Sequence, residues 1–94
     1  MTWNELYKEL RQAKSAKIHL KIGNLVKTFK IVEIGDSEIN QRVTIKYLDD
    51  YEAETSMDII MMAEIIKATK GNYLIKTAIY ESKQKIEFLI ITTS

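Results

Sequence analysis

The sequence predicts an α+β domain with an antiparallel sheet of about five strands and two helices, in the order α-β-β-β-α-β-β. Three observations lead to this prediction. Apolar residues recur at helical spacing near the N-terminus, and they alternate with period two over residues 17–47 and 73–91. A nearly continuous apolar run lies between these two regions. Since the chain has only 94 residues, we expect one domain over residues 1–94.

The first element is a helix over residues 2–15. Thr2 and Glu5 have the spacing of a capping box, in which each side chain accepts a hydrogen bond from a backbone N–H group of the first turn. Apolar residues then recur at helical spacing, at Trp3, Leu6, Tyr7, Leu10 and Ala13. Charged and polar residues fill the positions between them, which indicates one buried and one solvated face.

A hairpin is expected next. Alternation from Lys17 to Ile22 indicates a half-buried strand, with Ile18, Leu20 and Ile22 on one face. The pair Gly23-Asn24 suits a tight turn, because glycine accepts positive φ at the first central position.

The return strand spans residues 25–34, and its apolar phase slips between Ile31 and Val32. A bulge, or a strand end covered on both faces, would explain this slip. A turn at residues 35–37 then leads to a third strand over residues 43–47, which completes a meander.

A second, mostly buried helix is expected over residues 55–70. Thr55 and Asp58 mark its start, and Gly71 suits the position after its end. Its interior is apolar nearly all round, at Met57, Ile59, Ile60, Met61, Met62, Ala63, Ile65 and Ile66. Such a surface exceeds what one sheet face covers, so either the first helix or a second copy of the chain must cover the rest. We therefore consider a homodimer through Met57, Met61 and Met62.

Two further strands close the chain. Residues 73–80 and 86–91 alternate with period two, and residues 81–84 form the hairpin loop between them. The run from Phe88 to Ile91 is apolar on both faces, which indicates a central strand.

Composition excludes several classes of function. The absence of cysteine excludes a disulfide scaffold, a thiol nucleophile and a zinc ribbon, and it fits a reducing, cytoplasmic location. The glycines Gly23, Gly35 and Gly71 lie too far apart for a phosphate-binding loop. His19, the single histidine, lies on the outward phase of a strand. We therefore expect no catalytic residue, no metal site, no cofactor and no enzyme activity. Neither an export signal nor a membrane-spanning run is visible.

The densest charged feature is an acidic segment that contains Asp49, Asp50, Glu52, Glu54 and Asp58. These carboxylates could bind a hard cation, although the segment lacks the alternating acids and the central glycine of an EF-hand loop. They could also imitate a row of phosphates, or simply form a solvated turn and a helix start. The aromatic Tyr51, which a solvated turn does not need, favours contact with a partner.

Charge is divided unevenly along the chain. Residues 1–47 carry nine basic and five acidic side chains, whereas residues 48–94 carry five basic and eight acidic ones. The basic residues of the first helix and strand could form one phosphate-binding surface, at Lys8, Arg11, Lys14, Lys17 and Lys21. However, the residues between them are aliphatic rather than aromatic, and the net charge is only +1.

The chain resembles the small proteins of phages and mobile elements of low-GC Gram-positive bacteria, including anti-CRISPR inhibitors of the Cas9 effector. The likeness covers about the first 70 residues: the helix that begins Met-Thr-Trp-Asn-Glu-Leu-Tyr-Lys-Glu-Leu, the strand Lys-Ile-His-Leu-Lys-Ile, and a meander that leads into a second helix. The resemblance implies a compact, non-enzymatic α+β protein that blocks a host machine by surface contact. Residues 49–54 would correspond to the face that imitates nucleic acid, but the strongly acidic members differ from this chain in net charge.

The leading hypothesis is therefore a non-enzymatic protein–protein interaction module, an inhibitor of a host nucleic-acid machine. Its expected contact residues are Asp49, Asp50, Tyr51, Glu52 and Glu54. The alternative is a small nucleic-acid-binding accessory protein that uses the Lys-rich helix and hairpin.

Overall fold

The structure, a computed structural model, describes residues 1–93, apart from the side chain of Ile22. Within these residues the fold is mostly β, with one short helix and a single antiparallel sheet of seven strands. The helix is α1 (Trp3–Gln12), and the strands are β1 (Ser15–Ile22), β2 (Leu25–Ser37), β3 (Arg42–Leu48), β4 (Glu54–Ile60), β5 (Glu64–Thr69), β6 (Asn72–Ala78) and β7 (Lys85–Thr93). The strand order across the sheet is β4-β3-β2-β1-β7-β6-β5.

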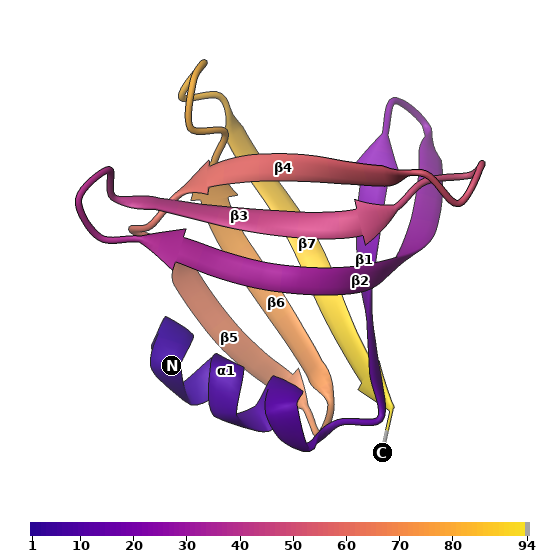
Figure 1. Ribbon diagram of the computed structural model, residues 1–94. Coiled ribbons are helices and arrows are strands. Elements are labelled where there is room, and N and C mark those ends of the chain that lie inside the picture. The colour runs from indigo at the N-terminus through magenta and orange to yellow at the C-terminus, as the bar shows by residue number, and fades with distance from the viewer. Residues whose placement is uncertain (94) are drawn as a thin grey trace.

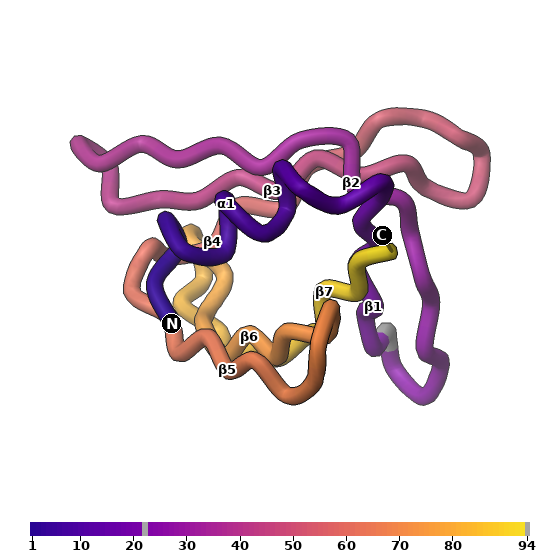
Figure 2. Tube along the Cα trace, turned by 90° about the horizontal axis from the view of Figure 1, so that it is seen from below, coloured from indigo at the N-terminus to yellow at the C-terminus, as the bar shows by residue number. Residues whose placement is uncertain are grey.

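The sheet curls so that its two halves face each other as two layers (Figure 1). One layer contains β1, β7, β6 and β5, and the other contains β3, β4 and the second half of the long strand β2. Strand β4, at one end of the sheet, meets the residues that follow β6: Ile59 forms an isolated bridge with Ile79, and the Tyr80 N–H donates to the Asp58 carbonyl at 2.9 Å. The result is a barrel-like sheet with one open end, and α1 lies across that end (Figure 2).

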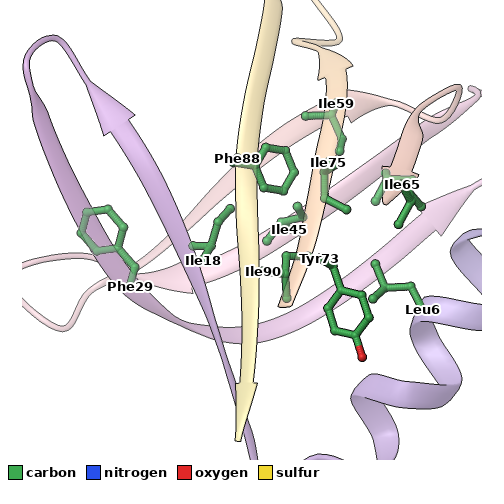
Figure 3. Close-up of a cluster of buried hydrophobic side chains, with 11 residues drawn as sticks. Leu6, Ile18, Phe29, Ile45, Ile59, Ile65, Tyr73, Ile75, Phe88 and Ile90 are labelled. Carbon is green, nitrogen blue, oxygen red and sulfur yellow. The ribbon is translucent and has the colours of Figure 1, made fainter. Parts of the chain in front are cut away.

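The core fills the space between the layers (Figure 3). Inward positions of both layers contribute, together with one residue of the helix. The buried cluster contains Leu6, Ile18, Phe29, Val43, Ile45, Ile59, Ile65, Tyr73, Ile75, Phe88 and Ile90. Phe29 and Tyr47 also stack against each other, with ring centroids 5.1 Å apart.

The helix confirms the prediction for the N-terminal segment, although it ends at Gln12 rather than at residue 15. Thr2 and Glu5 form the expected capping box. Leu6 is the buried residue of α1, and the Trp3 indole N–H donates to the Met61 carbonyl at 2.7 Å. These contacts fix α1 against the open end of the barrel.

The predicted fold class, five strands and two helices, is wrong for residues 55–70. This segment forms β4 and β5, which a corner at residues 61–63 separates. Strand β4 pairs with β3 along its whole length, and β5 pairs with β6. The residues read as a helix cap, Thr55 and Asp58, therefore lie within β4, and the element order on which the resemblance rested changes after residue 54.

Two physical features explain this error. A short apolar run rich in isoleucine fits a buried helix and a buried strand equally well by its pattern, but branched side chains favour the strand. Gly71, read as the residue after a helix, instead supplies positive φ of 83° in the turn between β5 and β6. A Cβ there would lie 3.0 Å from the Thr92 hydroxyl oxygen, so the turn also needs glycine for space.

Without the second helix, the predicted homodimer through a methionine stripe loses its structural basis. Met57 and Met61 are half-buried and pack against the core, whereas Met62 is exposed at the corner between β4 and β5. The three side chains therefore do not form one continuous face.

The N-terminal meander is confirmed, with two differences in detail. The β1–β2 hairpin turns at Gly23-Asn24 as expected, and a register shift between Ile31 and Glu33 makes Val32 the extra residue of a bulge. The turn expected at residues 35–37 is wrong, because β2 continues through Ser37 and the chain turns at residues 38–41.

The C-terminal hairpin agrees with the expectation. Strand β7 lies between β1 and β6 and is therefore a central strand.

The inward position expected for Ile22 lies outside the described residues. In the part of the chain that the structure describes, no helix has the length and apolar character to cross a membrane.

Candidate functional site

The loop between β3 and β4 is internally braced. One carboxylate oxygen of Asp49 accepts hydrogen bonds from the backbone N–H groups of Tyr51 and Ala53, at 2.8 and 3.0 Å. The Asp49 N–H donates to the Ala53 carbonyl at 2.9 Å, and the Glu52 N–H donates to the Asp49 carbonyl at 3.0 Å. Glu52 has φ of 59°, in the left-handed region. These contacts close the loop and hold Tyr51 outward, where 91% of its surface is exposed.

An ion pair joins this loop to the β1–β2 hairpin. The Lys27 ammonium lies 2.6 Å from a carboxylate oxygen of Asp50. Both hairpins lie at the same end of the molecule (Figures 1 and 2). Close to Lys27 in sequence, Leu25 and Val26 are 65% and 54% exposed.

We call this region the hairpin-end surface, and it contains Leu25, Lys27, Asp50, Tyr51 and Glu52. Val26 is left out, because successive residues of a strand point to opposite faces and Val26 lies beside His19 and Lys21 instead. The hairpin-end surface combines an exposed aromatic and an exposed aliphatic side chain with charges of both signs, a mixture that contact surfaces between proteins often have.

The structure divides the five predicted contact residues by role. Asp49 is committed to bracing the loop, and Asp50 is committed to the ion pair with Lys27. Tyr51, Glu52 and Glu54 are exposed and have no such contact among the described residues. Three of the five predicted contact residues therefore have exposed side chains, and the ion pair of Asp50 brings the β1–β2 hairpin beside them.

The acidic segment does not form a single cluster. Asp58 lies in β4, where its carboxylate accepts a hydrogen bond from the Thr44 hydroxyl at 2.6 Å and lies 3.9 Å from the Arg42 guanidinium. Within residues 1–93, no three His, Cys, Asp or Glu side chains lie close enough together to hold a metal ion.

The basic residues predicted as a nucleic-acid surface occupy two elements. Lys8 and Arg11 are exposed on α1, and Lys14 follows its end. Lys17 and Lys21 are exposed on β1, and Lys17 lies opposite Lys30 of β2 in the sheet register. His19, on the same face of β1, shares a hydrogen bond of 2.8 Å with the Thr28 hydroxyl.

A groove between α1 and β2 is a further feature that the sequence did not indicate. Its volume is about 530 Å³, within the range of ligand sites in proteins. Tyr7 of α1 lines it, and the hydroxyl oxygen of Tyr7 is buried without a hydrogen-bond partner among the described residues. Burial, with a smaller contribution from the charge of Asp36, raises the pKa of Tyr7 to about 12.

A polar contact fixes the other flank of α1. The Lys67 ammonium of β5 donates to the Glu9 carboxylate. This hydrogen bond is the main cause that lowers the pKa of Glu9, and it also raises the pKa of Lys67. Tyr73 lies beside the pair, and its own burial raises the pKa of its hydroxyl.

These features define a small, mostly β protein with a curled seven-stranded sheet, a helix across one open end, and exposed apolar groups at two hairpins. Comparison of the chain with protein-family models, with curated proteins and with solved structures finds no match.

Proposed function

We propose that the protein is a non-enzymatic interaction module that binds a protein partner through the hairpin-end surface. The observation that carries this proposal is the exposure of Tyr51 on a loop that is braced from within. A tyrosine offers a large contact area, and a loop already held in place loses little conformational entropy when it binds.

The partner class to test first is a host nucleic-acid machine, which the protein would inhibit by blocking its surface. The support for this class is the resemblance of the N-terminal segments to phage and mobile-element inhibitors. Imitation of nucleic acid is not needed, because Asp49 and Asp50 are occupied within the protein and the net charge is +1. The proposed contact instead depends on apolar and aromatic groups.

The test is affinity capture from a bacterial lysate treated with nuclease, followed by mass spectrometry. Tyr51→Ala should weaken capture of the partner about 10- to 30-fold, as expected for loss of an aromatic residue at the centre of an interface. Ile39→Ala is the matched control, since Ile39 is 96% exposed in the turn between β2 and β3 but has no part in the hairpin-end surface. If both variants capture the same proteins as the original chain, the proposed contact surface is wrong.

A specific feature favours a second candidate, nucleic-acid binding on the outer face of β1 and β2. Lys17 and Lys30 lie directly opposite each other, an arrangement of like charges that destabilises a sheet unless an anion lies between them. Changing Lys14, Lys17 and Lys21 to glutamate should then abolish salt-dependent binding to single- or double-stranded DNA and RNA. Absence of such binding in the original chain would exclude this candidate.

A further inference from the structure

One edge of strand β2 lies open at the end of the barrel. Residues 31–37 pair with β3 on one side, whereas the pairing with β1 ends at Lys30, opposite Lys17. The first residues of β1, Ser15 and Ala16, pair only with β7. Among the described residues, no strand therefore lies beside residues 31–37 on the side away from β3.

Backbone groups along this edge have no main-chain partner. The hydrogen bonds between backbone groups outside the strand ladders do not involve residues 31–37 in the described part of the chain. An open edge of this kind presents alternating N–H and C=O groups that can pair with another extended chain. At about 3.4 Å per residue, the edge has a length of about 20 Å.

The helix α1 lies beside this edge (Figures 1 and 2), and its side chains form the opposite wall of the α1–β2 groove. On the helix side, the groove is lined by Tyr7, Leu10, Arg11 and Lys14. On the strand side, it is lined by Ile31, Val32, Glu33, Ile34 and Asp36. Ser15 and Ala16 close one end, at the place where β1 turns away from β2.

The helix wall of the groove is basic. Arg11 and Lys14 are exposed, and neither forms an ion pair within residues 1–93. The Arg11 side chain donates to the Tyr7 carbonyl, which keeps the guanidinium beside the groove. Leu10 and Ile34 are half-buried and offer apolar contacts below these charges.

We propose that the α1–β2 groove binds an extended peptide segment of a partner protein, which adds as a strand to the open edge of β2. A row of unpaired main-chain groups is satisfied by another extended backbone, and not by a helix or an apolar small molecule. The segment carries apolar side chains at alternate positions, toward Leu10 and Ile34, and an acidic side chain opposite Arg11 and Lys14. This site is separate from the hairpin-end surface and does not depend on it.

The test uses the full chain and a library of synthetic peptides of about seven residues, in which branched apolar residues alternate with random ones and one Asp or Glu is fixed. Binding of a selected peptide should protect the amide protons of residues 31–37 from solvent exchange, measured by NMR. Methylation of the peptide backbone nitrogens at alternate positions gives two matched variants. The variant methylated on the side that faces β2 should bind at least about tenfold more weakly, and the other should keep its affinity.

Charge reversal provides an independent control. Arg11→Glu combined with Lys14→Glu should weaken binding of the acidic peptide about tenfold, whereas Lys8→Glu, outside the groove, should leave it unchanged. Tyr51→Ala should also leave it unchanged, so that failure of this proposal and failure of the proposed function are distinguishable.

Three results would overturn the proposal. The library could yield no peptide that protects these amides, or both methylated variants could bind equally well. Protection of the same amides that grows with protein concentration in the absence of peptide would show that a second copy of the chain occupies the groove.

Discussion

Replacement of Leu6 by alanine tests whether α1 is an integral part of the core. Leu6 is fully buried, and α1 has only ten residues, too few for a helix that is stable in water without tertiary contacts. Leucine-to-alanine changes in a packed core cost about 2–5 kcal/mol. We expect about 3 kcal/mol here, because α1 lies at the open end of the barrel and can shift inward to reduce the cavity.

The assay is equilibrium unfolding in urea followed by circular dichroism. Domains of this size are stable by about 5–15 kcal/mol, so the variant should still fold, with a lower midpoint and an unchanged slope. The melting temperature should fall by about 12–24 °C, since each kcal/mol corresponds to about 4–8 °C in a domain of this size. Leu10→Ala is the matched control, because Leu10 lies on the same helix but is only half-buried, and it should cost about 1 kcal/mol.

A loss below about 1 kcal/mol for Leu6→Ala, or a loss equal to that of Leu10→Ala, would refute this reasoning. Either result would mean that α1 rests on the barrel without sharing its core. Hydrogen exchange distinguishes the two situations, since amides of an integral helix open only with the whole domain.

Three further results are expected. Gly71→Ala should destabilise the protein by about 1–3 kcal/mol in urea unfolding, because Gly71 has positive φ and a Cβ there would lie close to Thr92. Gly35→Ala is the control: Gly35 lies in an extended strand with open space around it, so stability should change by at most about 0.5 kcal/mol. Because the folded-state pKa of Glu9 is lowered, its pairing with Lys67 stabilises the fold above pH 4.5, and that contribution is lost as the pH falls through the folded pKa. Glu9→Gln should therefore flatten the acid side of the pH–stability curve. An unchanged curve would contradict the pairing. Because the pKa of Tyr7 is raised from 10.0 to about 12, the stability of the fold should decrease as the pH rises between these values. In a titration followed by phenolate absorbance, Tyr7→Phe should remove one tyrosine that ionises near pH 12.

Features set by neighbouring residues were predictable from sequence. The capping box of Thr2 and Glu5, the hairpin turn at Gly23-Asn24 and the slip in phase near Val32 all involve contacts over a few residues. Residue type and spacing alone predict each of these features, and the structure confirms each one.

The candidate site was predicted in part for the same reason. The pattern of the acidic segment indicated an exposed aromatic at Tyr51, and the structure places it in solvent on a braced loop. That Asp50 pairs with Lys27, 23 residues away in sequence, depends on how the two hairpins approach each other. The groove beside β2 could not be predicted from the sequence either, because it depends on where the pairing of β2 with β1 stops.

The sequence by itself determined where the first helix begins, where the first hairpin turns, and which residues of most strands face inward. Only the tertiary structure decided that residues 54–69 are two strands, which end the sheet at β4 and β5. The physical reason is that an isoleucine-rich apolar run can be buried as a helix or as a strand at similar local cost. The choice depends on hydrogen bonds to β3 and β6, and these partners lie elsewhere in the chain.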